Sequence, residues 1–596
     1  MMSISGRPMG RTRRGVHWAM RCAGIAIAVC CAGLAAGCMG GEDVSSGSLS
    51  AALAFTRVTE EAGLGAYRHE NGGLGQKWMP EIVGPGGAFL DYDGDGWQDI
   101  LLVGGGRWAR VSDEPVEALR LYRNLGDGTF EDVSVAAGLS GMEAYGFGVA
   151  AADYDNDGDT DFFLTTLHEN LLFRNDGGRF EEVGEEAGLA DEAYWSTSAA
   201  FFDADGDGWV DLFVGNYVSW TPETDIPCFH GGEKAYCTPQ NYAGVASTFY
   251  RNTGDGSFVD ATQEAGFSGA IDPVLDKTLG VTELDVTGDG HSDLYVANDT
   301  ERNLLFVNRG DGTFVESAVR SGVAYDQHGQ SRAGMGVDAG VVDSTGQTTI
   351  FVGNFTQETV SVFRHASGGY FTDRATISRV GFPTMGTLTF GLFLFDADLD
   401  GDLDLFLANG HVLEHIAEIL EGATFAEPAQ LFLNRGDGIF DEAPATTGVL
   451  AQPMVARGAA YADYDRDGDL DVLLLENAGP AHLWRNDLNE SGWLHVRLEG
   501  RASNRSALGA RIEAVVGDLR MERRVRSGSS FLSQSALPAV FGLGARRQID
   551  SLIVHWPSGL VERFAEVEAG QEVILVEGSA ALRPAEPAAG HSGELR

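Results

Sequence analysis

Aspartates are clustered at short, regular spacing in the segment DYDGDGWQD, residues 91–99. Carboxylates stand at relative positions 1, 3, 5 and 9 of this segment, and a glycine stands at position 6. Carboxylates this close repel one another unless a cation lies between them, and ligands made only of oxygen favour a hard ion such as Ca²⁺. The segment therefore predicts a calcium-binding loop with a structural role.

The same pattern occurs six times along the chain. We predict about six structural Ca²⁺ sites, in which positions 1, 3, 5 and 9 supply carboxylates and position 7 supplies its backbone carbonyl. The alternative is a set of solvated acidic turns without metal. The predicted ligands are Asp91, Asp93, Asp95, Trp97 and Asp99; Asp153, Asp155, Asp157, Asp159 and Asp161; Asp203, Asp205, Asp207, Trp209 and Asp211; Asp285, Asp289, His291 and Asp293; Asp396, Asp398, Asp400, Asp402 and Asp404; and Asp463, Asp465, Asp467, Asp469 and Asp471.

Two copies of the loop are weaker than the others. The fourth loop has Val286 and Thr287 in place of the usual Tyr-Asp or Ala-Asp, so it keeps only Asp285, Asp289 and Asp293, and a seventh, degenerate copy around Asp343 has lost most of its carboxylates. None of the six is an EF-hand, because position 12 is always Leu or Val and never the bidentate Glu. The sequence beyond each loop is strand-like, so each predicted site joins two β-strands.

Each loop belongs to a larger repeat. A strand of small residues precedes the loop, an apolar strand follows it, a third strand ends in asparagine in six units, and a Gly-Asp-Gly hairpin usually opens a fourth strand. Four short strands repeated seven times predict an all-β, seven-bladed β-propeller over residues 53–487. The last unit lacks a fourth strand and the chain begins with an unpaired one, so Phe55–Thr59 is expected to complete the last blade and close the ring.

The N-terminal residues are typical of an export signal. Five arginines precede a short apolar run that ends in LAAGC, which resembles a bacterial lipobox. We predict a lipoprotein-type signal peptide over 1–37, lipidation of Cys38, and a linker over 38–52. Anchoring would then be in the bacterial envelope, at the outer membrane or cell surface. The alternative is plain secretion, and both general secretion and a twin-arginine route fit the arginine pair.

Two cysteines follow the signal region, Cys228 and Cys237. In an oxidising compartment they are expected to form a disulfide, the alternative being two free thiols. The chain carries 41 basic and 87 acidic side chains, a net charge of −46, which argues against a nucleic-acid partner.

The aspartate pattern stops near Trp493. Residues 490–577 alternate apolar and polar side chains, which predicts a small all-β domain, and residues 578–596 are expected to be disordered. The domain is locally basic. Its arginines are expected either to dock against the acidic propeller or to form a patch for an anionic ligand.

Both parts of the chain resemble known families. The loops resemble the FG-GAP, or VCBS-like, repeats of integrin α-chain propellers. The segments SNRSALGARI, SGSSFLSQS, FGLG and VHWPSG resemble the ASPIC/UnbV domain of the acidic secreted cartilage protein family and its bacterial relatives. The resemblance implies an exported, calcium-binding protein whose biochemical activity is largely undefined.

We predict a non-enzymatic binding or adhesion module at the cell surface, with a protein or carbohydrate ligand and with the membrane reached only through the anchor at Cys38. Three insertions are candidate contact elements, at 104–118, 220–245 and 411–428. The alternatives are an extracellular hydrolase or lyase acting on a polymer, and a structural subunit of an envelope complex. The enzyme alternative could use HVLEH, where His411, Glu414 and His415 fit an inverted zinc motif. Two Arg-Gly-Asp tripeptides lie in predicted hairpins and are interpreted as structural turns.

Overall fold

The computed structural model describes residue 53 and residues 55–585, except 74, 107–116, 143, 190–193, 367–368, 445–447 and 489–490. The predicted signal peptide, Cys38 and most of the 104–118 insertion lie outside the described residues. Residues 51–596 form one compact unit.

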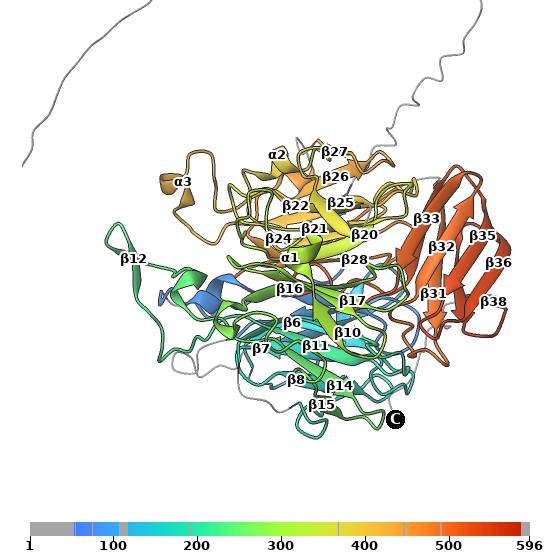
Figure 1. The fold of residues 1–596 in the computed structure, drawn as a ribbon, viewed down its shortest axis with the longest axis horizontal. Helices are drawn as coiled ribbons and strands as arrows, with labels where there is room; N and C mark the ends of the chain where they lie inside the picture. The colour runs from blue at the N-terminus through green and yellow to red at the C-terminus, as the bar shows by residue number, and fades with distance from the viewer. Residues whose placement is uncertain are drawn as a thin grey trace, which may run out of the picture. The chain divides into compact units, whose positions relative to one another are not determined.

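Seven four-stranded antiparallel sheets follow one another in the described chain and form the predicted propeller (Figure 1). Blades 1 to 4 consist of β2 (Gly87–Leu90), β3 (Asp99–Val103), β4 (Leu119–Asn124) and β5 (Phe130–Asp132); β6 (Gly146–Ala152), β7 (Asp161–Thr166), β8 (Leu171–Asn175) and β9 (Phe180–Glu182); β10 (Ser196–Phe202), β11 (Asp211–Asn216), β14 (Thr248–Asn252) and β15 (Phe258–Asp260); and β16 (Thr278–Leu284), β17 (Asp293–Asn298), β18 (Leu304–Asn308) and β19 (Phe314–Glu316). Blades 5 to 7 consist of β20 (Val337–Val341), β21 (Thr348–Val352), β22 (Ser361–Ala366) and β23 (Tyr370–Asp373); β24 (Thr389–Phe395), β25 (Asp404–Asn409), β26 (Gln430–Asn434) and β27 (Phe440–Glu442); and β28 (Ala456–Ala462), β29 (Asp471–Glu476), β30 (Ala481–Arg485) and β1 (Thr56–Arg57).

The first strand of the chain closes the ring, as predicted. β1 pairs with β30 through Thr56 opposite Arg485 and Arg57 opposite Trp484, and Val58 N–H donates to the Leu483 carbonyl at 2.9 Å. The innermost strand of each blade contacts the innermost strand of the next, from β2 through β28 and back to β2. No blade is therefore left without a neighbour on either side.

Small residues in the innermost strands are needed because neighbouring blades approach closely there. A Cβ on Gly336 would lie 2.2 Å from the Phe390 carbonyl oxygen of the next blade, and one on Gly391 would lie 2.6 Å from the Arg457 carbonyl oxygen. The predicted small-residue strand is thus a packing requirement of the ring.

The asparagine that ends the third strand links each blade to its neighbour. Asn252 donates to the Val210 carbonyl in its own blade at 3.1 Å and to the Tyr154 carbonyl of blade 2 at 2.9 Å, and accepts from Gly254 N–H at 2.9 Å. The corresponding contacts to the preceding blade come from Asn124, Asn175, Asn308, Asn434 and Asn486. Blade 5, whose third strand ends at Ala366, has no such asparagine.

Short elements lie within and between the blades. The hairpin of β12 (Cys228–His230) and β13 (Glu233–Ala235) lies within blade 3, between β11 and β14, and α3 (Ile416–Ile419) lies within blade 6, between β25 and β26. The helices α1 (Ala318–Ser321) and α2 (Gly381–Thr384) lie between blades 4 and 5 and between blades 5 and 6. Among the described residues, no helix has the length and apolar character required to cross a membrane.

The C-terminal domain contains two further four-stranded sheets. They consist of β34 (Ala539–Gly544), β31 (Gly492–Glu499), β37 (Gln571–Val576) and β38 (Leu582–Pro584), and of β33 (Leu519–Arg524), β32 (Arg511–Val516), β35 (Gln548–His555) and β36 (Val561–Glu568). β38 pairs with β37. Ordered structure therefore extends past residue 577, where the sequence predicted a disordered tail, because Leu582 and its neighbours complete a sheet edge.

A loop of this domain, residues 527–536, inserts among the innermost strands of the propeller, and we call it the plug. Gln534 exchanges backbone hydrogen bonds with β2, where Gln534 N–H donates to Gly87 and Phe89 N–H donates to Gln534, both at 3.0 Å. On the other side of the ring, Ser530 N–H donates to the Val337 carbonyl at 2.8 Å. Phe531 packs against Phe390 of blade 6 with ring centroids 4.9 Å apart. The plug thus contacts several blades at once.

Removing one inter-blade asparagine tests its role. Asn252→Ala leaves two carbonyls and one N–H without their partner in a buried place, so we expect a loss of roughly 2–4 kcal/mol in the free energy of unfolding. Urea denaturation measures it. Thr253→Ala, at the adjacent exposed position, is the matched control. Equal effects of the two substitutions would contradict the assignment.

Candidate metal centres

Five of the six predicted loops bring three carboxylates together among the described residues. Each loop is numbered here by its blade, so the degenerate loop around Asp343 is loop 5. In loops 1, 2, 6 and 7, positions 1, 3 and 9 each offer a carboxylate oxygen, and in loop 3 positions 1, 3 and 5 do so. In every group the three oxygens lie within 4.8 Å of one another. The groups are Asp91, Asp93 and Asp99; Asp153, Asp155 and Asp161; Asp203, Asp205 and Asp207; Asp396, Asp398 and Asp404; and Asp463, Asp465 and Asp471. Asp285, Asp289 and Asp293 of loop 4 are not among these groups.

The aspartate at position 9 fastens each loop to its blade. Asp99 accepts from Tyr92 N–H at 3.0 Å with one oxygen and from Asn124 N–H at 2.7 Å with the other. The same two contacts recur at Asp161, Asp211, Asp293, Asp404 and Asp471. One side chain thus joins the loop, the second strand and the end of the third strand.

The glycine at position 6 allows the loop to turn back on its first carboxylate. Gly158 has a φ of 108° and donates its N–H to Asp153 at 2.8 Å. Gly468 has a φ of 106° and donates to Asp463 at 3.0 Å. Left-handed backbone at this position is costly for residues with a Cβ, which explains why glycine stands here in all six copies.

Burial makes these carboxylates difficult to ionise without a cation. The pKa of Asp153 is raised to about 7 and that of Asp203 to about 6, chiefly by burial and in smaller part by the neighbouring aspartates, although backbone N–H donors oppose the rise. In loops 1 and 7, buried oxygens of Asp91, Asp93, Asp463 and Asp465 have no hydrogen-bond partner among the described residues. Unpaired oxygens that face one another fit a hard cation such as Ca²⁺.

The degenerate loop of blade 5 contains an ion pair where the other loops contain further carboxylates. Its single aspartate, Asp343, has a side chain only 2% exposed and contacts the guanidinium of Arg364 on β22. The sequence analysis did not identify Arg364, because an arginine within a strand has no distinctive spacing.

Two arginines and one histidine of the C-terminal domain contact position 1 of three loops. Arg497 lies 3.5 Å from Asp91, Arg523 lies 3.3 Å from Asp396, and His495 Nδ1 lies 3.5 Å from Asp463. These contacts place the C-terminal domain on the side of the propeller that carries the aspartate loops, which we call the calcium-loop side after the metal predicted for them. Of the two interpretations of its basic residues, docking against the acidic propeller agrees with this arrangement.

The other predicted site residues lie elsewhere. Cys228 and Cys237 form a disulfide. His411 and His415 both precede α3, and His411 Nδ1 accepts from Leu413 N–H at 2.9 Å. Burial, with the charge of Arg457, lowers the pKa of His411 to about 4. Among the described residues, neither histidine belongs to a group of three side chains that could hold a metal ion.

The Arg-Gly-Asp tripeptides form turns, as interpreted. Asp311 accepts from Thr313 N–H at 3.1 Å within its own hairpin. The backbone of Asp437 forms an isolated antiparallel β-bridge with the backbone of Asp343 in the neighbouring blade. Both aspartates are thus used in local structure.

Comparison with protein families agrees with this architecture. The FG-GAP-like repeat matches residues 91–164, 153–214, 285–340 and 419–474, and the ASPIC and UnbV family matches residues 500–582. The chain contains FG-GAP-like repeats and a C-terminal ASPIC and UnbV domain. Such repeats and this domain are typical of extracellular binding modules.

Individual relatives are more distant. Human cartilage acidic protein 1 is 28% identical over 295 residues, which is 47% of this chain and 41% of the relative. The mouse protein is 28% identical over 308 residues, which is 50% of this chain and 44% of the relative. The matches therefore span less than half of each relative. An Agrocybe aegerita lectin that recognises non-reducing terminal N-acetylglucosamine shares 17% identity over 60% of this chain and 79% of the lectin, with a TM-score of 0.35, too low to support an argument.

The ion pair in blade 5 gives a test that does not depend on metal. Arg364→Gln leaves Asp343 buried without its cation, so we expect about 3 kcal/mol of destabilisation in calcium and in EGTA alike. The double variant Asp343→Asn with Arg364→Gln should recover most of it. Urea unfolding measures both, with exposed Arg374→Gln as the control. A loss that appears only in calcium would contradict the assignment.

Proposed function

We propose that this protein is an exported, cell-surface binding module in which calcium stiffens the propeller and the ligand contacts the side opposite the calcium loops. The observation that supports it is the position of the C-terminal domain, which contacts the calcium-loop side and places the plug among the innermost strands. The remaining side carries the insertions.

Topology separates the two sides. Each calcium loop joins the first strand of a blade to the second, whereas the insertions between β11 and β14 and between β25 and β26 join second strands to third strands. Because successive strands are antiparallel, these connections leave from opposite edges of the sheet. In Figure 1 the β12 hairpin and α3 extend from the side away from β31 to β38. Long connections on a rigid scaffold are where ligand contacts are usually found.

Several large apolar side chains of the insertions are exposed to solvent. Phe229, on the disulfide-linked hairpin, is 67% exposed, Ile226 beside it is 42% exposed, and Ile419 on α3 is 50% exposed. The disulfide holds the hairpin in shape before contact, which lowers the entropy lost on binding. A protein or carbohydrate at the cell surface is the proposed ligand. Lipid at Cys38 is the proposed membrane attachment, and the acidic chain disfavours nucleic acid.

Calcium, when bound, supplies positive charge among the loop carboxylates. Asp91, Asp93, Asp463 and Asp465 would hold it with their unpaired oxygens. The residues of the chain then keep each turn in one geometry. The position 9 aspartate joins the loop to the third strand of its blade, and the position 6 glycine lets the backbone turn back toward the position 1 aspartate. The role is structural and involves no reaction step.

Calcium binding is tested by titration and by chelation. We expect calorimetry of the purified chain to show Ca²⁺ binding, and EGTA to lower the melting temperature, since ligand at 100 times its Kd stabilises by about 2.7 kcal/mol per site. Asp155→Asn, at position 3, should weaken one site roughly tenfold, or about 1.4 kcal/mol. Asp159→Asn, at position 7, keeps the backbone carbonyl and is the matched control. Titration without heat and unchanged melting would refute the proposal.

The ligand-binding side is tested by substitution of exposed apolar residues. We expect the double variant Ile226→Ser with Phe229→Ser to lose binding found on glycan arrays or in cross-linked envelope fractions, at unchanged melting temperature. Val259→Ser, 50% exposed on β15 at the outer edge of blade 3, is the control. If the control variant lost binding and the hairpin variant kept it, the insertion side would not be the contact surface.

A further inference from the structure

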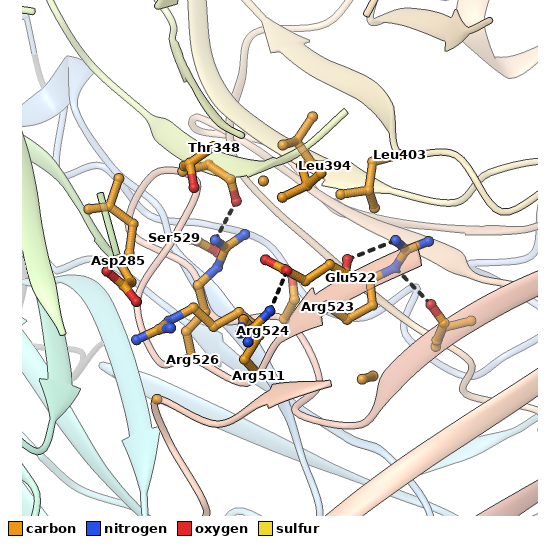
Figure 2. Close-up of a pocket in the computed structure, with 18 of the residues that line it drawn as sticks. Asp285, Thr348, Leu394, Leu403, Arg511, Glu522, Arg523, Arg524, Arg526 and Ser529 are labelled. Carbon is orange, nitrogen blue, oxygen red and sulfur yellow. Dashed lines mark hydrogen bonds and ion pairs between the residues drawn. The ribbon is translucent and has the colours of Figure 1, made fainter. Parts of the chain in front are cut away.

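Three arginines of the C-terminal domain stand within four residues at the end of β33. Arg523, Arg524 and Arg526 lie on the wall of a cavity of about 420 Å³ between this domain and the propeller (Figure 2). We call these three residues the arginine clamp. Each contacts a carboxylate in a different blade.

Arg524 binds blade 4. Its Nε lies 2.8 and 2.9 Å from the two carboxylate oxygens of Glu283, which stands on β16 two residues before loop 4 and is 1% exposed. The same guanidinium lies 3.3 Å from the hydroxyl of Ser292, at the end of that loop. Arg524 therefore reaches both ends of the loop that has the fewest carboxylates among the six predicted metal loops.

Arg526 binds blade 5. It contacts Asp338 of β20, whose side chain is 1% exposed, and donates to the Ala339 carbonyl at 2.5 Å. Asp338 also accepts from Leu394 N–H of blade 6 at 2.7 Å. Within blade 5, Asp343 is paired with Arg364. Both buried aspartates of this blade thus have a guanidinium partner.

The blades that receive Arg524 and Arg526 are those without a carboxylate group suited to a metal. The five groups found among the described residues belong to blades 1, 2, 3, 6 and 7. In blade 6, Arg523 makes a single 3.3 Å contact with Asp396 in addition to the group. A guanidinium remains charged at all physiological pH values and binds carboxylates through several donors, so it can neutralise a buried carboxylate permanently.

We propose that the arginine clamp supplies blades 4 and 5 with the positive charge that calcium supplies to the other five blades. This inference rests on the proposed calcium binding. It makes the C-terminal domain an integral part of the propeller, because two blades would depend on its arginines in place of a metal. It also predicts five calcium ions per chain, one fewer than the six loops of the sequence pattern.

The test combines stoichiometry with hydrogen exchange of the full chain. Metal analysis after dialysis against Ca²⁺ should give five ions. On adding EGTA, peptides covering β6 and β10 should exchange at least about tenfold faster, whereas those covering β16 and β20 should change less than about twofold. In Arg524→Gln with Arg526→Gln, the β16 and β20 peptides should lose protection with calcium present, and the stoichiometry should stay at five.

Control variants and the metal analysis distinguish a failure of this inference from a failure of the proposed calcium binding. Exposed Arg520→Gln, on the same strand, should behave as the wild type. If the double variant does not fold, Arg524→Gln with Glu283→Gln removes the blade 4 pair without leaving a buried charge. The response of wild-type hydrogen exchange to EGTA, compared between β6 or β10 and β16 or β20, then tests the inference without any variant. Six or seven ions, or equal loss of protection in all blades with EGTA, would overturn the inference and leave calcium binding intact. Absence of bound calcium would overturn the proposed function and the inference together.

Discussion

The propeller depends on neutralising the carboxylates that its turns bring together. Each turn needs a position 1 aspartate to accept from the glycine N–H and a position 9 aspartate to accept from one loop N–H and one strand N–H, as Asp153 and Asp161 do in blade 2. Both are buried, so their charges are poorly solvated and repel one another. A blade can keep these hydrogen bonds at neutral pH when a cation lies nearby. The guanidinium of Arg364 supplies it in blade 5, and calcium is the cation proposed for the loops with three carboxylates.

Charge neutralisation in the loops affects the whole ring because the contacts are linked. Asp211 accepts a hydrogen bond from Asn252 N–H, and the side-chain amide of Asn252 donates to the Tyr154 carbonyl of blade 2. A loop that loses its cation therefore loosens its own third strand and the contact with the preceding blade. The plug adds a second set of links from the centre, through Gln534 to blade 1 and Ser530 to blade 5. A change in the stability of one loop therefore changes the stability of several blades.

The sequence predicted what is repeated and missed what occurs once. The blade order, ring closure by residues near Thr56 and the position of the loops follow from spacing, because the same local pattern had to be satisfied seven times. Arg364 was not predicted, because a single arginine in a strand has no repeated spacing that points to Asp343. The arginines of the C-terminal domain were expected to dock against the propeller or to bind an anion, but spacing could not name the partners of the arginine clamp, which lie more than 100 residues away in the chain. The motif SGSSFLSQS was recognised only as a family feature. The structure shows that it forms the plug, where a Cβ on Gly528 would lie 2.6 Å from the Ala199 carbonyl oxygen.

A rigid ring with its centre filled has a consequence for recognition. Because the plug occupies the space among the innermost strands and the C-terminal domain contacts the side that carries the aspartate loops, the proposed ligand would contact the connections on the other side. These connections vary from blade to blade, whereas the loops repeat. The hairpin around Phe229 and the segment around Ile419 come from blades 3 and 6, so their separation is set by the ring between them. Calcium would then act on binding by fixing the distance between two contact elements that it does not touch.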